Sequence, residues 1–275
     1  MVAVSSILDS LRLDPRGDGC FGAVNVDTGH PVVFGGQLLA QSIVAALVGQ
    51  QGKTVKTLHT VFARAADPAS PVEITVDPLH AGRAMASSTV TISQGERICT
   101  RSSVLMSADE PDLIRHAAPA PAADPPPAAP TGADWLVQVV GGVDLSDPEQ
   151  VGPPELQVWT AFPGAPDDAG TNQALLAFAT DGFLIGTAMR PHRGVGQAQA
   201  HVTLSTGVLS HTITFHEPFS ATQWMLLAHR STYAGRGRSY GQADVFTAGG
   251  TFVGSFVQDS MIRAMAERKP GSVAL

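Results

Sequence analysis

The stretch Ala117–Pro130 reads AAPAPAADPPPAAP and divides the 275-residue chain into two parts of similar length. Proline fixes φ and removes a backbone hydrogen-bond donor, and alanine has little side chain to pack. We therefore expect an extended and exposed linker over residues 111–133. It would join an N-terminal domain, residues 1–110, to a C-terminal domain, residues 134–275.

Four landmarks recur in the same order on the two sides of this linker. They are HTV at 59–61, AGR at 81–83, Gly95 and Met106 in the first part, and HTI at 211–213, AGR at 234–236, Gly250 and Met261 in the second. The spacing between matching landmarks stays within 152 to 155 residues, which indicates a duplicated unit. The AGR and glycine landmarks lie between alternating β-type runs, as is typical of hairpin turns.

Each copy has an apolar stretch with helical spacing ahead of its strands. Residues 35–47 and 172–189 repeat leucine, isoleucine or phenylalanine at steps of three and four, and residues 1–14 have the spacing of a shorter amphipathic helix. One long helix wrapped by one sheet is a stable layer arrangement. The sequence thus predicts the α+β class and a tandem double hotdog, in which each half is a long central helix wrapped by an antiparallel sheet.

Composition argues against several classes of function. The chain has 24 acidic and 17 basic residues and a net charge of −7, which disfavours nucleic-acid binding. No apolar run approaches the roughly 18 residues of a membrane span, and the start lacks the basic region of an export signal, so a cytoplasmic protein is expected.

Cys20 and Cys99 have no CxxC spacing, which disfavours a zinc site or a disulfide framework. His211 and His216 are five apart on one expected strand, hence on opposite faces, which disfavours a shared metal.

Five strings in the same order resemble the type II acyl-CoA thioesterases, a TesB-like family of double-hotdog proteins. They are VFGGQ at 33–37, QVW at 157–159, LAFATD at 176–181, HEPF at 216–219 and VQD at 257–259. The resemblance spans almost the whole chain. It implies hydrolysis of acyl-CoA thioesters to a carboxylic acid and coenzyme A, with no metal or organic cofactor. It also implies a homodimer or a higher homo-oligomer.

The resemblance implies a water molecule that attacks the thioester carbonyl, held by an Asp, a Thr and a Gln. Asp181 matches the Asp on the second helix and Gln258 the Gln on the last strand, whereas Val208 stands at the Thr position. Even-numbered residues of a regular strand share one face. We therefore expect the hydroxyl of Thr206 or of Ser210 to take the place of the missing threonine.

The residue types at these positions suit that chemistry. A carboxylate in an apolar helix has a raised pKa and can deprotonate water. The alternatives are that Asp181 caps a second helical segment near Gly182 or faces solvent. The Gln258 amide can fix a neutral water, and the alternative is an outward polar residue. In the first copy Ala45 and Ser103 take the corresponding places, so one water-activating centre per chain is expected.

A second set of residues is expected to bind the substrate. Gly35, Gly36 and Gln37 open the first helix, where free amides can polarise a thioester oxygen, although a glycine pair there also serves close packing. Phe178 and Phe183, with Phe215 and Phe256, are expected to keep water from an acyl groove between helix and sheet. Three arginines at expected hairpin turns are candidates for coenzyme A phosphates or for plain solvent exposure, and they are Arg83, Arg236 and Arg238.

Two other functions stay open on the same fold. The first is a non-catalytic or weakly active acyl-CoA-binding protein, which Val208 supports. The second is an enoyl-CoA hydratase, which needs a histidine a few residues from the helical Asp. No histidine follows Asp181 before His192, so this possibility ranks last.

Overall fold

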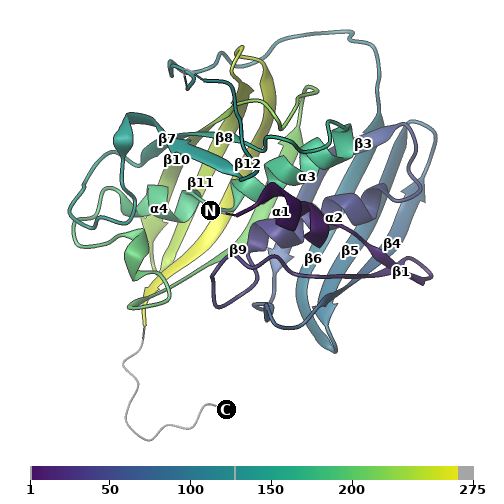
Figure 1. The fold of residues 1–275 in the computed structure, drawn as a ribbon, viewed down its shortest axis with the longest axis horizontal. Coiled ribbons are helices and arrows are strands. Elements are labelled where there is room, and N and C mark those ends of the chain that lie inside the picture. Colours follow the sequence, from purple (N-terminus) through teal and green to yellow (C-terminus); the bar gives the residue numbers. More distant parts are fainter. Residues whose placement is uncertain (1, 127, 266–275) are drawn as a thin grey trace, which may run out of the picture.

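A computed structural model of the chain describes residues 2–126 and 128–265, so the expected domain end at residue 275 lies outside the described residues. Twelve strands form one antiparallel sheet in the order β1-β2-β4-β5-β6-β3-β9-β12-β11-β10-β8-β7 (Figure 1). The first half contributes β1 (Asp14–Gly17), β2 (Cys20–Ala23), β3 (Lys53–Phe62), β4 (Val72–Ala81), β5 (Met85–Gln94) and β6 (Arg97–Ala108). The second contributes β7 (Leu136–Val139), β8 (Glu155–Ala161), β9 (Leu204–Phe215), β10 (Met225–Gly235), β11 (Arg238–Thr247) and β12 (Phe252–Ala264). The halves join where β3 pairs with β9.

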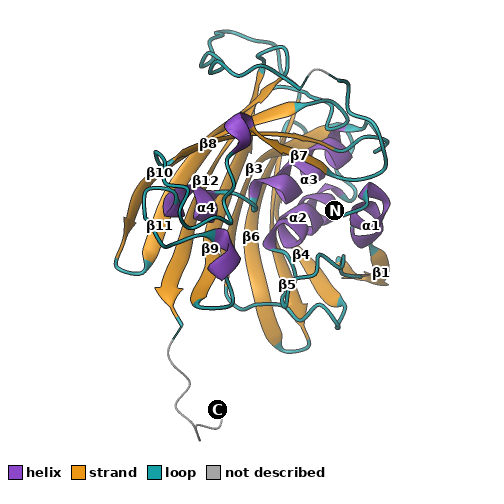
Figure 2. Cartoon of the chain, turned by 60° about the vertical axis from the view of Figure 1, so that its left-hand side comes forward, coloured by secondary structure: helices purple, strands orange, loops and turns teal. Residues whose placement is uncertain are grey.

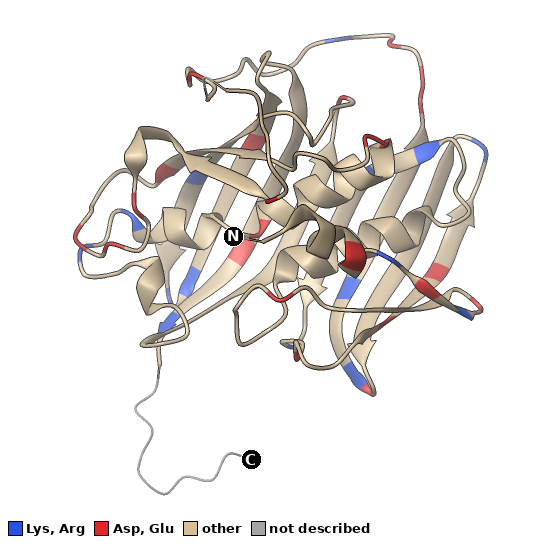
Figure 3. Ribbon diagram, in the orientation of Figure 1, with Lys and Arg blue, Asp and Glu red and all other residues tan. Residues whose placement is uncertain are grey.

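The two central helices lie side by side on one face of this sheet (Figure 2). They are α2 (Gly35–Leu47) and α3 (Ala169–Thr180), and neither carries a charged residue (Figure 3). Most α2 side chains are buried because the helix is covered by the sheet, by α3 and by the short helix α1 (Val4–Ser10). The double-hotdog prediction is thereby confirmed, as is the N-terminal helix expected within residues 1–14.

The second apolar stretch is two helices and not one. Helix α3 ends at Thr180, and α4 (Leu184–Met189) begins after Phe183, which has non-helical dihedrals of φ −126° and ψ −24°. Glycine is a poor helix former, and the turn at Gly182 places the Phe183 ring in a cluster with Leu156 and Val158. The expectation of one helix over 172–189 is therefore wrong at this turn.

The hairpin turns lie where the landmarks predict them, but the matching His-Thr strings are not equivalent. Arg236 and Gly237 have φ values of 54° and 72°, the left-handed region that a tight β10–β11 turn requires. His59 is exposed whereas His211 is fully buried. The two histidines matched by the spacing of 152 residues therefore lie on opposite faces of the sheet. Ser103 is likewise exposed, and so it is not the counterpart of the buried Gln258.

The proline-rich segment is mostly exposed, as expected, but it is held on the sheet. The Trp159 indole donates to the Asp124 carbonyl at 3.0 Å, and the Trp224 indole donates to the Ala128 carbonyl at 2.8 Å. These bonds lay the segment over the aromatic cluster on the face opposite the helices. Both cysteines are free thiols. Among the described residues, no helix has the length and apolarity needed to cross a membrane.

Candidate active site

Asp181 stands at the junction of the two central helices, as the residue that caps the C-terminus of α3. Its Oδ2 accepts a hydrogen bond of 3.1 Å from the Gly36 amide at the start of α2. Its Oδ1 is buried and has no partner among the described residues. Burial raises the pKa of Asp181 to about 7, against the opposing effect of the Gly36 and Gly35 amides. The carboxylate does not cap α4, whose N-cap is Phe183, so that alternative is wrong.

A buried hydrogen bond joins the residue before Asp181 to the sheet. Thr180 Oγ1 lies 3.1 Å from His211 Nε2 and also donates to the Ala177 carbonyl at 2.8 Å. Burial lowers the pKa of His211 to about 3, so the ring is neutral. His211 on β9 is the cross-strand partner of Gln258 on β12, and partners on neighbouring strands point to the same face. Gln258 therefore lies on the helix-facing side of the sheet, beside the histidine that contacts the residue before Asp181.

Gln258 has an unusual environment for a buried amide. The side chain is 1% exposed, and neither Oε1 nor Nε2 has a partner among the described residues. A buried polar group without a partner costs free energy, and it is retained where it binds a ligand or water. The region thus contains a carboxyl group with a raised pKa and a buried amide without a partner among the described residues.

A β-bulge in β9 decides which hydroxyls reach this face. Asp259 pairs with Ser210, but the next residue of β12, Ser260, pairs with Val208, so Leu209 is the extra residue. The bulge reverses the alternation, and Ser210 faces away from the helices together with Asp259. The expectation that positions 206, 208 and 210 share one face is wrong for Ser210.

Thr206 is on the helix-facing side of β9. It is 9% exposed, and its partner on β12 is Ile262. This pair lies four pairs beyond the His211–Gln258 pair along the strand. The structure therefore brings one of the two expected hydroxyls to the inner face, at a distance from Gln258 along the strand.

The glycines and the glutamine at the start of α2 have other partners than a substrate. A Cβ on Gly36 would lie 2.2 Å from the Phe178 carbonyl oxygen, so glycine is required for the close approach of α2 and α3. The Gln37 amide donates to Asn25 Oδ1 and accepts from the Val26 amide, both at 2.8 Å. The structure thus makes Gly36 a support for Asp181 and gives Gln37 a structural partner.

The expected groove phenylalanines are core residues. Phe178 is fully buried, 5.0 Å from the Phe34 ring, and Phe183 packs 5.5 Å from the His229 ring. Phe256 lies between His211 and His229, and Phe215 packs on Phe219. Of the arginines at the turns, Arg83 and Arg236 are exposed, and Arg238 donates to the Gly237 carbonyl.

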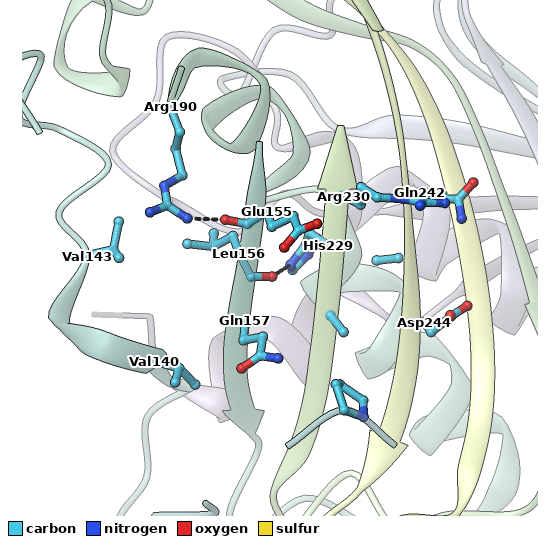
Figure 4. A pocket seen from close by; sticks show the side chains of 13 residues that line it. Val140, Val143, Glu155, Leu156, Gln157, Arg190, His229, Arg230, Gln242 and Asp244 are labelled. Carbon is cyan, nitrogen blue, oxygen red and sulfur yellow. Dashed lines mark hydrogen bonds between the residues drawn. The ribbon is translucent and has the colours of Figure 1, made fainter. Parts of the chain in front are cut away.

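Two open hollows of the surface lie away from Asp181 and Gln258. One of about 560 Å³ is lined by Glu155, Arg190, Arg230, Gln242 and Asp244 among others (Figure 4). Another of about 670 Å³ lies between the proline-rich segment and β7. Neither is lined by Asp181 or Gln258. We locate the candidate site at Asp181 because a reaction requires a suitable base and not only open volume.

Two residues of this region were not expected from the sequence. Thr180 lies within the LAFATD string, and its position next to Asp181 is the sequence feature that could have identified it. Ser260, opposite Val208, lies just beyond the VQD string and gives no sequence signal without the strand register. Among the described residues, no group of His, Cys, Asp and Glu side chains is arranged to hold a metal ion.

Comparison with known families assigns the chain. Residues 24–107 match the acyl-CoA thioesterase N-terminal domain, and residues 111–262 match the acyl-CoA thioesterase C-terminal domain. The chain belongs to the acyl-CoA thioesterase family. This confirms the resemblance seen in the sequence and makes the chain a member of a family of thioester hydrolases.

Individual relatives are similar over most of their length. The chain is 27% identical to acyl-CoA thioesterase 2 of Haemophilus influenzae, with 94% of this chain and 98% of that protein covered. It is 24% identical to human acyl-coenzyme A thioesterase 8, with 92% and 87% covered. The solved structure of an acyl-CoA thioesterase II TesB2 from Mycobacterium marinum superposes with a TM-score of 0.79 at 25% identity, with 97% and 99% covered.

Proposed function

We propose that the protein hydrolyses acyl-CoA thioesters with a water molecule activated between Asp181 and Gln258. The observation that carries this proposal is that Asp181 Oδ1 and both polar atoms of the Gln258 amide are buried and have no partner among the described residues. The Thr180–His211 hydrogen bond supports it because it ties the Asp181 turn to the cross-strand partner of Gln258. Family membership supports acyl-CoA as the substrate class.

Asp181 acts as the general base. A base works best when its pKa is near the working pH, and burial raises the pKa of Asp181 to about 7. Its Oδ1 accepts a proton from water as the water oxygen bonds to the thioester carbon. The carbon–sulfur bond then breaks, and the same proton passes to the leaving thiolate. Water and the thioester become a carboxylic acid and coenzyme A.

Gln258 orients the water without competing for its proton. Its Oε1 accepts the second water hydrogen, which turns a lone pair of the oxygen toward the thioester carbon. Its Nε2 is left to donate to the oxygen of the carbonyl as negative charge develops there. The amide does both without changing its own charge.

A weakly active acyl-CoA-binding protein is the second candidate. Val208 favours it because the side chain faces the site where the related enzymes are expected to have a hydroxyl. The two candidates differ in turnover and not in binding, so a rate measurement separates them.

The test is steady-state release of free thiol from short-, medium- and long-chain acyl-CoAs. We expect turnover by the wild type and a decrease in kcat on the order of 100-fold or more for Asp181→Asn and Gln258→Ala. Asp259→Asn and Gln242→Ala are matched controls, because both side chains lie on the opposite face of the sheet, and their kcat should stay within about twofold. Binding without turnover by the wild type would favour the acyl-CoA-binding protein.

A further inference from the structure

We propose that the Ser260 hydroxyl is the third group that holds the attacking water, in place of the hydroxyl that Val208 lacks. This inference rests on the proposed function because it concerns the same water. It assigns a role to Ser260, which is not among the residues that the family resemblance implies.

The strand register places Ser260 at the site. Ser260 follows Gln258 by two residues on β12, so both side chains leave the same face of the strand. Each is 1% exposed. Because of the bulge at Leu209, Ser260 directly opposes Val208, and directly opposed β-carbons lie about 5 Å apart. A hydroxyl on residue 260 thus enters the space next to residue 208 from the neighbouring strand.

The Asp181 carboxylate approaches the same level of the sheet. A Cβ on Gly35 would lie 2.7 Å from Asp181 Oδ2 and 3.1 Å from the Phe62 ring, so the carboxylate and the ring are neighbours. Phe62 is the last residue of β3 and immediately follows the last pair between β3 and β9. That pair is at the start of the bulge. Asp181 therefore lies near the level, along the strands, of the pair formed by Val208 and Ser260.

A hydroxyl can donate the hydrogen bond that the attacking water is still able to accept. A water that donates to Asp181 and to Gln258 keeps two lone pairs, one aimed at the thioester carbon and one free. A hydroxyl donating to the free lone pair fixes the direction of attack.

The other hydroxyls are less well placed. Ser210 faces the opposite side of the sheet with Asp259. Thr206 opposes Ile262, one step further from Gln258 than Ser260, which is about 7 Å along the strand. Ser260 is therefore the hydroxyl of these strands that lies level with Val208.

A rescue experiment tests the assignment. Ser260→Ala should lower kcat on the order of tenfold to 100-fold, with KM changed far less. Adding Val208→Thr to that variant should restore kcat to within a few fold of the wild type, because the new hydroxyl emerges opposite the lost one. Ser210→Ala is the matched control, with kcat within about twofold. Ser260→Cys keeps the volume of the side chain and replaces Ser260→Ala if the alanine variant fails to fold.

The outcomes separate this inference from the proposed function. Wild-type kcat in Ser260→Ala, with activity lost in Asp181→Asn and Gln258→Ala, would overturn the role of Ser260 and leave the proposed function standing. Loss in Ser260→Ala without rescue by Val208→Thr would make the serine a packing residue and also overturn its role. Ser239 is the buried partner of Ser260 on β11, so an equal loss in Ser239→Ala would point to the same conclusion. Full activity of Asp181→Asn would overturn the proposed function and this inference together.

Discussion

Thr180 and His211 form a buried hydrogen bond of 3.1 Å between helix α3 and strand β9. The Thr180 hydroxyl already donates to a helix carbonyl, so its oxygen accepts the proton of His211 Nε2. This selects the neutral histidine with an unprotonated Nδ1, an atom that has no partner among the described residues. Asp181 follows Thr180, and Gln258 is the cross-strand partner of His211, so this hydrogen bond links the turn that carries Asp181 to the strand pair that carries Gln258.

Removing the hydrogen bond between Thr180 and His211 should lower the stability of the protein. We expect Thr180→Val to lower the free energy of unfolding by about 1–3 kcal/mol, because a buried imidazole N–H loses its acceptor. Urea unfolding measures it. Thr212→Val is the matched control, since its hydroxyl pairs with the exposed His59 at 2.8 Å, and the loss should stay below about 1 kcal/mol. Equal losses would contradict the structural importance of the Thr180–His211 bond.

The contact between α2 and α3 leaves no room at Gly36. A Cβ there would lie 2.2 Å from the Phe178 carbonyl oxygen and 2.6 Å from the Phe34 ring. We expect Gly36→Ala to cost about 2–4 kcal/mol of stability and to lower kcat, because the helices must separate and the amide that binds Asp181 moves with α2. Thermal and urea unfolding test this. Gly170→Ala, whose Cβ would lie 3.2 Å from a leucine methyl, should be tolerated far better.

Local patterns were sufficient for much of the fold. The apolar spacing over 35–47 predicted α2 with the bounds that the structure has, and the AGR landmarks predicted the hairpin turns. These features depend on residues near one another in the sequence. The two copies also share a buried glutamine near the start of the central helix, Gln37 in α2 and Gln173 in α3. Each amide binds the backbone of a distant segment, at Val26 and at Val55 respectively.

The strand register could not be predicted in the same way. A bulge at Leu209 reverses the faces of one strand relative to regular alternation, and it is visible only once β12 is aligned with β9. For this reason Ser210 was expected at the site and Ser260 was not. The same limit explains the match of the exposed His59 to the buried His211, since a shift of one residue exchanges the two faces of a strand.

The pKa of Asp181 predicts how the rate depends on pH. A general base must be ionised, and burial raises the pKa of Asp181 to about 7. We expect kcat/KM to rise with pH through about 7 and then to level off, with a slope of one on a logarithmic plot below the pKa. Thiol release between pH 5 and 9 measures the profile. A rate that is flat from pH 5 to 8 would contradict the assignment of Asp181 as the base.

Two buried histidines predict a loss of stability in acid. Burial lowers the pKa of His211 to about 3 and that of His229 to about 4, whereas both groups titrate near 6.5 in the unfolded chain. Their contribution is fully present above pH 6.5 and is lost as the pH falls toward 4, because protons then bind to the unfolded chain. We expect His229→Gln to reduce the dependence of the unfolding free energy on pH in this range.

Asp181 should affect stability with the opposite sign. Because its pKa is higher in the folded chain, its contribution is fully present below pH 4 and is lost as the pH rises through about 7. We expect Asp181→Asn to abolish turnover and yet to be more stable than the wild type at pH 8, by about 1–3 kcal/mol, since the amide still accepts from Gly36 without a buried charge. Urea unfolding at pH 5 and 8, with Asp259→Asn as the control, measures the difference. A variant that is less stable at pH 8 would mean that the carboxylate supports the fold, whereas a gain in stability would mean that the chain keeps a costly charge for its chemistry.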